Sequence, residues 1–171
     1  MTYAVSDIHG RYDKYAAMLE IINFRDNDML YVLGDVIDRH DDGIKIMLDM
    51  ISRPNIVMLM GNHEAMMLDT LLGFEQINEE SIDKMSLWVL NGGGPTLTAF
   101  LEIGKKDRID ILNSLERMPY YKESEVCGKK FVLLHGGLEN FSPERPLCDY
   151  SRDEIVCGEP DLSMDISKIN L

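Results

Sequence analysis

The chain has 171 residues and a formal net charge of −13 at pH 7, with 45% hydrophobic and 27% charged residues. This length and composition suit one globular domain with a sizeable core, and the acidity excludes binding to a nucleic-acid backbone, which needs a cationic face. The chain shows no apolar run long enough to cross a bilayer, no signal-peptide pattern and no paired cysteine spacing, so we expect a cytoplasmic protein with reduced thiols and no membrane partner.

Apolar runs and helical patterns alternate along the first 72 residues. Strands are predicted at residues 3–6, 29–33 and 55–60, and helices are predicted at 12–22, 43–52 and 62–72. This βαβαβα order predicts parallel strands whose following loops converge at the carboxyl edge of the sheet. Periodicity alone therefore favours a doubly wound α/β sheet.

The middle of the chain predicts a helical cap over that sheet, at residues 74–118. Helices are predicted at 81–90, 96–103 and 107–118, with a break at Asn91-Gly92-Gly93-Gly94-Pro95. Strand character resumes at 120–124 and 130–134, joined by a hairpin turn at 126–129. We expect a single domain over 1–171, with a core of 1–73 and 119–171 and the cap between them.

Four short polar segments each follow an apolar run: Asp7-Ile8-His9-Gly10, Gly34-Asp35-Val36-Ile37-Asp38-Arg39, Gly61-Asn62-His63-Glu64 and His135-Gly136-Gly137. Asp7 and His9 are two residues apart at a strand end, so extended backbone would point both toward one cation. Asp35 can bridge two cations through its two oxygens, Asn62 offers a carbonyl oxygen and His135 a ring nitrogen. This mixed oxygen and imidazole set suits Mn, Fe or Zn.

This combination of residue types suits phosphate ester hydrolysis. Two cations about 3.5–4 Å apart can hold a hydroxide in line with the phosphorus and neutralise the transferred oxygens. His63 is placed to protonate the leaving alkoxide, Asp38 can orient its imidazole, and Arg39 can bind a phosphate oxygen.

Each of these residues also has an ordinary structural alternative. Asp7 and Asp35 can cap the following helices or form turns, the glycines can serve tight turns, and a single histidine is more often structural than functional. Three of the four histidines, however, directly follow predicted strands beside Asp, Asn or Gly. The coincidence favours the metal site.

The motifs D-x-H-G, G-D-x-x-D-R, G-N-H-E and H-G-G, in this order, resemble those of the PPP-type phosphoprotein phosphatases. These enzymes belong to the calcineurin-like metallophosphoesterase superfamily, and the chain is most similar to its small bacterial and phage members. The resemblance covers residues 2–138. It implies a β-sandwich flanked by helices, with a helical cap, in place of the doubly wound sheet.

The resemblance also implies roles for individual residues. Asp7, His9 and Asp35 would hold one divalent metal, Mn first of all, and Asp35, Asn62 and His135 would hold a second. His63 and Asp38 would form the acid dyad and Arg39 would bind phosphate, while the segment Asn91-Gly92-Gly93 would approach the substrate groove.

The chain departs from the family pattern in three places. Relatives usually continue to a Gly-His-Thr segment whose histidine is a further ligand of the second metal, whereas this sequence ends first at Leu171, so we expect a weak second site and an incomplete second sheet. His40 stands where the family usually has glycine and is a candidate replacement ligand. Glu159 falls where relatives carry a phosphate-binding arginine; nearby Arg152 either compensates or forms a surface ion pair.

We therefore predict a metal-dependent phosphoserine/phosphothreonine protein phosphatase acting on a phosphoprotein or phosphopeptide. Glu64 after His63 favours this activity over the first alternative, a dinucleoside polyphosphate hydrolase that shares the metal motifs. The second alternative is a degenerate phosphatase that binds a partner without turnover. An uncovered edge of the second sheet would also allow self-association.

Overall fold

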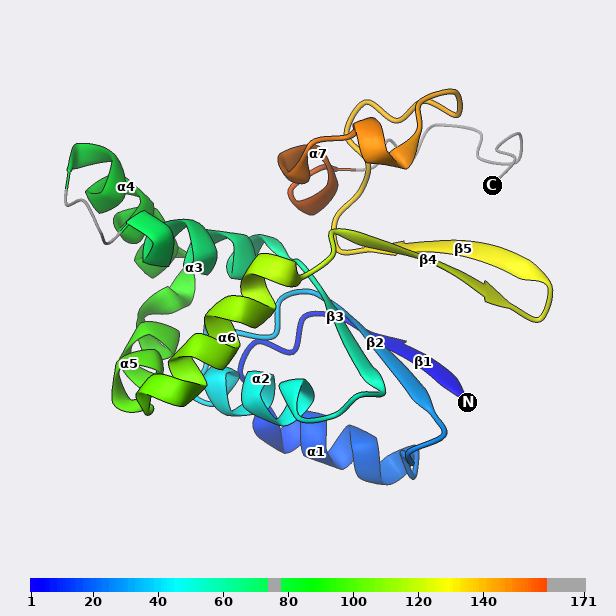
Figure 1. The fold of residues 1–171 in the computed structure, drawn as a ribbon, viewed down its shortest axis with the longest axis horizontal. Helices are drawn as coiled ribbons and strands as arrows, with labels where there is room; N and C mark the ends of the chain where they lie inside the picture. The colour runs from blue at the N-terminus through cyan, green and yellow to red at the C-terminus, as the bar shows by residue number, and fades with distance from the viewer. Residues whose placement is uncertain (74–77, 160–171) are drawn as a thin grey trace.

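The structure, a computed structural model, describes residues 1–73 and 78–159. One sheet contains three parallel strands in the order β1-β2-β3 (Figure 1): β1 (Thr2–Val5), β2 (Met29–Leu33) and β3 (Ile56–Leu59). Its two crossovers contain helices α1 (Tyr12–Ile21) and α2 (Gly43–Ile51). Because right-handed crossovers that step in one direction place their helices on the same face, this strand order leaves the opposite face free of crossover helices.

The mixed arrangement with two sheets is confirmed, and the doubly wound sheet expected from periodicity is wrong. A doubly wound sheet needs a reversal of strand order to put helices on both faces, and the order β1-β2-β3 contains none. Leu30 and Val32 of β2 are fully buried in the same hydrophobic cluster as Tyr15 of α1 and Met47 of α2. This cluster fixes the three strands and thereby the loops that leave them.

The cap is helical, as predicted, and packs on α2 and α3. Its helices and the one that leads into it have these bounds: α3 (Asn62–Leu72), α4 (Glu79–Trp88), α5 (Gly94–Glu102) and α6 (Lys105–Arg117). The predicted break at residues 91–95 is confirmed as a kink between two helices. A π-helical turn, η2 (Val89–Gly93), links α4 directly to α5, and the chain bends within it at Gly92, where φ is 101°. Glycine accepts this left-handed value without steric cost.

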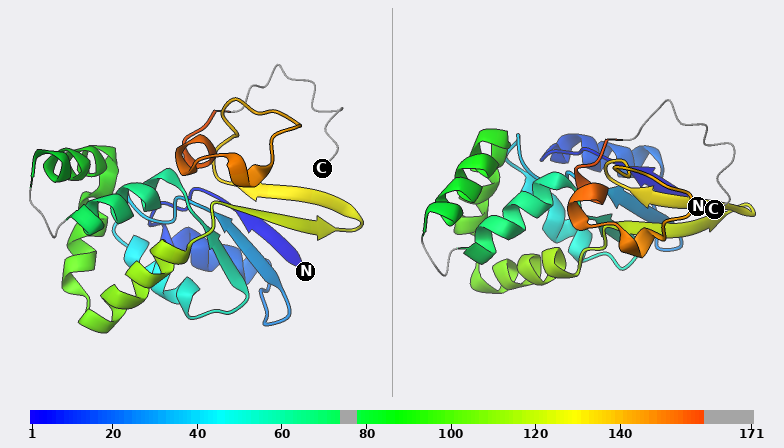
Figure 2. Two further views of the ribbon diagram at one scale, coloured as in Figure 1. Left: turned by 45° about the horizontal axis from the view of Figure 1, so that its top comes forward. Right: turned by 90° about the horizontal axis from the view of Figure 1, so that it is seen from above.

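The second sheet is the antiparallel hairpin of β4 (Tyr121–Val126) and β5 (Lys129–Leu134). Cys127 and Gly128 form its turn with φ values of 52° and 75°, the pair of positive values that suits the twist of a two-residue hairpin loop. The predicted hairpin turn is thus confirmed. The hairpin extends beside the parallel sheet (Figures 1 and 2).

Two short elements beyond the hairpin were not predicted: η3 (Leu147–Asp149) and α7 (Arg152–Val156). Helix α7 has a capping box, in which Ser151 Oγ accepts from the backbone N–H of Glu154 and the Glu154 carboxylate accepts from that of Ser151. The last twelve residues, with the predicted end of the core, lie outside the described part of the chain.

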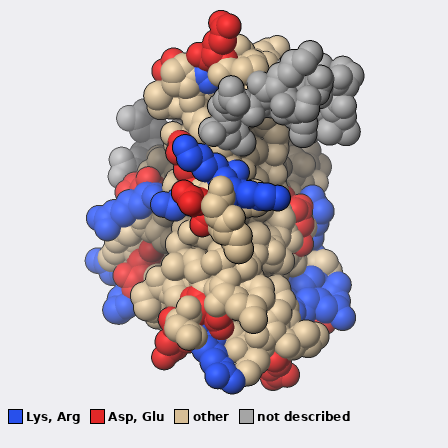
Figure 3. All heavy atoms as spheres, turned by 90° about the vertical axis from the view of Figure 1, so that its right-hand side faces the viewer, with Lys and Arg blue, Asp and Glu red and all other residues tan. Residues whose placement is uncertain are grey.

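The end of the molecule that carries the hairpin shows basic and acidic side chains interspersed, with uncharged surface between them (Figure 3). Val126 and Phe131 of the hairpin are 39% and 44% exposed. Self-association through this sheet stays a prediction. Among the described residues, no helix combines the length and the apolar character that crossing a membrane requires.

Candidate functional site

Three of the four polar segments leave the carboxyl ends of the parallel strands and run side by side. The backbone N–H of Asp7 donates to the carbonyl of Gly34 at 3.3 Å, and that of His9 donates to the carbonyl of Asp35 at 2.9 Å. The strand pairing thus continues into the loops. The fourth segment follows β5, which carries His135 to the same place.

Backbone strain is concentrated in these loops. Eight described non-glycine residues have positive φ, and five of them are predicted site residues: Asp7 (56°), His9 (46°), Asp35 (55°), Asp38 (70°) and Arg39 (66°). Such conformations persist only where the surrounding contacts enforce them, and they gather at functional sites. Neither Asp7 nor Asp35 is a helix cap, because the N-cap residues of α1 and α2 are Arg11 and Asp42.

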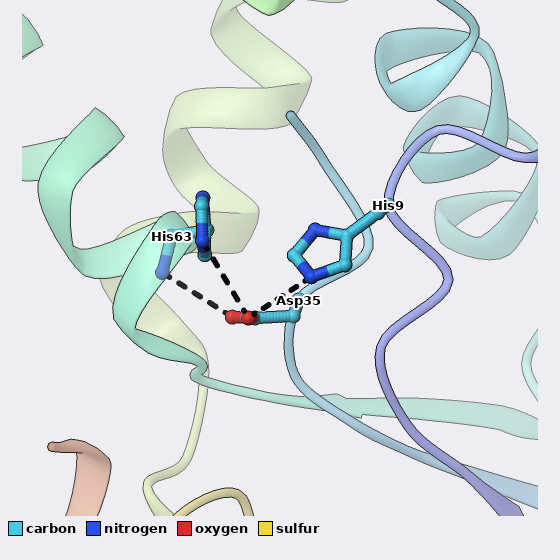
Figure 4. Close-up of side chains that lie close together, drawn as sticks. All are labelled: His9, Asp35 and His63. Carbon is cyan, nitrogen blue, oxygen red and sulfur yellow. Dashed lines mark hydrogen bonds and ion pairs between the residues drawn. The ribbon is translucent and has the colours of Figure 1, made fainter. Parts of the chain in front are cut away.

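The buried carboxylate of Asp35 lies at the centre of the site, between the rings of His9 and His63 (Figure 4). Its Oδ2 is 3.5 Å from His9 Nε2 and 3.7 Å from His63 Nε2. Its Oδ1 faces the other way, 3.4 Å from His135 Nε2. The same His135 nitrogen lies 3.0 Å from Asn62 Oδ1, and Asp7 Oδ1 lies 3.8 Å from His9 Nε2.

Two of the histidines bind a backbone carbonyl through Nδ1 and turn Nε2 toward this centre. Nδ1 of His9 lies 3.0 Å from the carbonyl of Ile37, and Nδ1 of His135 lies 2.6 Å from the carbonyl of Leu33. A carbonyl can only accept, so each Nδ1 donates; the lowered pKa of His9 favours its neutral ring, which keeps its lone pair on Nε2. Metal-binding histidines are oriented in this way. Nε2 of His9 is buried with no hydrogen-bond partner among the described residues, as a vacant ligand atom would be.

His63 has a different partner. Its Nδ1 lies 2.6 Å from Oδ2 of the fully buried Asp38. Burial lowers the pKa of His63, but the hydrogen bond to Asp38 and the charges of Asp35 and Asp38 outweigh it, so the pKa lies above its ordinary value. Burial also lowers the pKa of His9. The hydrogen bond to the Ile37 carbonyl and the charge of Asp35 raise it by less, so this pKa lies below its ordinary value. The two rings are therefore biased toward opposite protonation states. Arg39 Nη2 lies 3.3 Å from His63 Nε2.

Glu64 shapes the site in a way that the sequence interpretation missed. Its completely buried carboxylate accepts from the backbone N–H groups of Asp35 (2.8 Å), Val36 (2.9 Å), Ile37 (3.4 Å) and Gly61 (3.1 Å). The loop after β2 is thus fastened to the start of α3. Its position as the third residue after the N-cap Gly61 was the available signal.

Two residues of the cap also reach the site and were not singled out. The indole Nε1–H of Trp88 donates to Asp38 Oδ2 at 2.8 Å, and the backbone N–H of Asp38 donates to Thr96 Oγ1 at 2.9 Å. The glycine-rich segment contacts the same loop, since the backbone N–H of Arg39 donates to the Gly92 carbonyl at 2.9 Å; its approach to a substrate groove stays a prediction.

Within the described residues, two groups bring ligand atoms within 4.8 Å of one another: His9 with Asp35 and His63, and Asp7 with Asp35 and His135. Both contain Asp35. These groups differ from the predicted sets, which joined His9 to Asp7, and the amide oxygen of Asn62 lies beside His135 of the second group. The donor set of carboxylates, an amide and imidazoles fits divalent transition metals.

The model of the family described as calcineurin-like phosphoesterase matches residues 2–163. The chain belongs to this calcineurin-like phosphoesterase family. Its divalent-metal chemistry agrees with the two His and Asp groups that could bind metal.

Among the relatives of this calcineurin-like phosphoesterase is serine/threonine-protein phosphatase 2 of Salmonella typhimurium, 31% identical over 134 residues, which are 78% of this chain and 56% of that protein. The symmetrical bis(5'-nucleosyl)-tetraphosphatase of Wigglesworthia glossinidia brevipalpis is 32% identical over 139 residues, 80% of this chain and 44% of that protein. The chain thus spans about half the length of the curated relatives it matches.

A solved structure described as a candidate diadenosine tetraphosphatase has the same fold. Its TM-score is 0.60 at 20% identity, over 90% of this phosphoesterase chain and 56% of the solved one. The mixed α/β calcineurin-like fold and the PPP-type resemblance expected from the motifs are confirmed.

The departures of this phosphoesterase from its family pattern can be located. His40 is exposed and its Nδ1 lies 2.8 Å from the carbonyl of His9; it belongs to neither metal-capable group of the described residues. Arg152 forms a bidentate pair with Asp69 at 2.7 and 2.8 Å, the surface ion pair that was one of its two predicted alternatives. Glu159 is exposed.

Proposed function

We propose that the protein is a metal-dependent phosphomonoesterase that removes phosphate from phosphoserine and phosphothreonine. The observation that carries the proposal is the position of Asp35, whose two carboxylate oxygens face two different sets of ligand atoms, with the His63–Asp38 pair beside them. Asp7, His9 and Asp35 would hold one divalent ion, Mn as the first choice, and Asp35, Asn62 and His135 would hold the other.

Bound divalent ions would activate water and neutralise charge on the phosphate oxygens. The protein's own residues would manage the proton and the substrate. The carboxylate of Asp38 raises the pKa of His63 against the effect of burial, and the protonated ring can give the proton on Nε2 to the leaving alkoxide. Arg39 is exposed beside that nitrogen, where its fork of donors can hold a phosphate oxygen.

The hydrolysis of dinucleoside tetraphosphates is the second candidate function. The tetraphosphatase of W. glossinidia brevipalpis is as similar to this chain as the protein phosphatase of S. typhimurium, at 32% and 31% identity. Glu64 does not separate the two, because its carboxylate is used to fasten backbone N–H groups inside the protein. The difference lies in the leaving group: an alkoxide needs a proton from His63, whereas a nucleotide phosphate leaves as a stable anion.

The test is turnover with added Mn of three substrates: a phosphoserine peptide, para-nitrophenyl phosphate and diadenosine tetraphosphate. We expect the peptide to be hydrolysed and the change Asp38→Asn to lower its kcat by about 100-fold or more. Asp26→Asn is the matched control, because Asp26 is an exposed aspartate outside the site. Preferred hydrolysis of the tetraphosphate would establish the second function. Bound metal without turnover of any substrate would refute both and leave a binding protein.

Metal content supplies an independent measurement. Two equivalents of Mn in the purified chain, measured by mass spectrometry, are expected if both ligand sets assemble; one equivalent would restrict the proposal to the set of Asp7, His9 and Asp35. We also propose that the protein acts in the cytoplasm, which the three exposed free cysteines support, since disulfides mark oxidising compartments.

A further inference from the structure

The carboxylate of Asp38 has a second donor besides His63. Oδ2 accepts from His63 Nδ1 at 2.6 Å and from the indole Nε1 of Trp88 at 2.8 Å. The other oxygen, Oδ1, is buried without a hydrogen-bond partner among the described residues. Two donors, His63 Nδ1 and Trp88 Nε1, bind the same oxygen and so set the rotation of the carboxylate about its Cβ–Cγ bond. Without the indole, His63 would face a carboxylate free to turn either oxygen toward it.

Trp88 is itself held firmly. The side chain is fully buried at the end of α4, and it is the only tryptophan of the chain. Gly93 packs against the indole so closely that an added Cβ would lie 2.5 Å from Nε1. A buried indole N–H needs an acceptor, and here that acceptor is the carboxylate of the acid dyad. The contact is thus a constrained one, with little room for the ring to move.

The backbone of the Asp38–Arg39 loop is held by the same segment of the cap. The N–H of Asp38 donates to Thr96 Oγ1 at 2.9 Å, and the N–H of Arg39 donates to the Gly92 carbonyl at 2.9 Å. Both loop residues have left-handed backbone, with φ of 70° and 66°, a conformation that is unfavourable for a non-glycine residue. Residues 88–96 therefore supply three hydrogen bonds to a strained pair of residues.

We propose that Trp88 is a positioning residue for the hydrolytic step. Its indole N–H fixes the Asp38 carboxylate and, through it, the ring of His63, so that the cap completes the acid dyad instead of only covering the sheet. The inference rests on the proposed function for its effect on turnover. The contact between Trp88 and Asp38 can be tested without turnover.

The kinetic test uses Trp88→Phe, which removes the N–H and keeps an aromatic ring. Because the proton from His63 matters for a poor leaving group, we expect kcat for a phosphoserine peptide to fall about tenfold, with KM unchanged. For para-nitrophenyl phosphate, whose leaving group departs without a proton, kcat should fall less than about twofold. Phe100→Leu is the matched control, since Phe100 is a buried aromatic of the cap without a hydrogen bond to the dyad.

An equal loss of kcat for both substrates, or the same pattern in Phe100→Leu, would show that Trp88 is only a core residue. A second measurement covers the case in which neither substrate is hydrolysed. The single indole N–H gives one cross-peak in the ¹H–¹⁵N spectrum of the intact chain, and we expect it to be protected from solvent exchange and to shift in Asp38→Asn. A cross-peak that is unprotected and does not shift would overturn the contact between Trp88 and Asp38. A protected and shifted cross-peak in a chain without turnover would overturn the proposed function alone.

Discussion

Replacing Glu64 with glutamine tests whether one buried carboxylate holds the metal-site loops in place. Each of its oxygens accepts two backbone N–H groups: Oε2 those of Asp35 and Gly61, and Oε1 those of Val36 and Ile37. The change Glu64→Gln turns one oxygen into an NH₂ group. The two backbone N–H groups that this oxygen accepted would then face another donor and lose their hydrogen bonds.

The structure gives the size of the effect. A hydrogen bond to a charged group contributes about 1.5–3 kcal/mol, so losing two of them should cost about 3–6 kcal/mol. The free energy of unfolding of a domain is only about 5–15 kcal/mol, so the loss is a large part of the total. The affinity for Mn should fall as well, because the loop that carries Asp35 loses its attachment to α3.

Urea unfolding, followed by the fluorescence of Trp88 and by circular dichroism, measures the first effect. Glu116→Gln is the matched control, because Glu116 is an exposed residue of α6 and its change should alter stability by less than about 0.5 kcal/mol. A loss below about 1 kcal/mol in Glu64→Gln would refute the reasoning, since the four contacts would then contribute no more than one ordinary hydrogen bond.

Three further outcomes are expected. In Gly61→Ala the added methyl group would collide with Oδ1 of Asp35, so Mn affinity measured by calorimetry should fall by about 10–100-fold. With metal removed by a chelator, the free energy of unfolding from urea titrations should be largest near pH 6.5. It should fall as the pH rises above this value, because the folded state stabilises the protonated form of His63, whose pKa is raised. It should also fall as the pH drops below this value, because the unfolded state binds a proton at His9 that the folded state, with its lowered pKa, does not. His63→Gln should flatten the alkaline side. Arg152→Met should cost about 1 kcal/mol or less and speed hydrogen exchange in α7 without affecting turnover, because the pair it breaks is partly exposed.

The convergence of the site could be predicted because it follows from strand direction. Asp7 and Asp35 come directly after apolar runs, and the carboxyl ends of parallel strands meet at one edge of a sheet. The left-handed backbone of the two aspartates could not be predicted, because in a sequence the same residues are compatible with a helix cap or a turn. The hydrogen bonds between the loops after β1 and β2 hold the two aspartates in this conformation.

The support from the cap could not be predicted, because it joins residues far apart in the chain. Trp88 lies 50 positions from Asp38, and Thr96 lies 58 positions from it. A tryptophan on an amphipathic helix predicts burial and carries no information about its acceptor. The kink at Gly92 could be predicted from Gly92-Gly93-Gly94-Pro95, but the early start of α5 at Gly94 could not, because proline is tolerated in the first turn of a helix.

The two central histidines show why residue type and spacing do not define a role. The rings of His9 and His63 lie 4.8 Å apart, and both face Oδ2 of the same Asp35. Burial lowers the pKa of both rings. It prevails in His9, whose Nδ1 donates to a neutral carbonyl, whereas in His63 the hydrogen bond from Nδ1 to a carboxylate and the charges of Asp35 and Asp38 outweigh it. Burial thus favours a neutral ring in His9, as a metal ligand must be, and the carboxylate stabilises in His63 the imidazolium that an acid needs. The surroundings of each ring thus support the proposed roles of His9 as ligand and of His63 as acid.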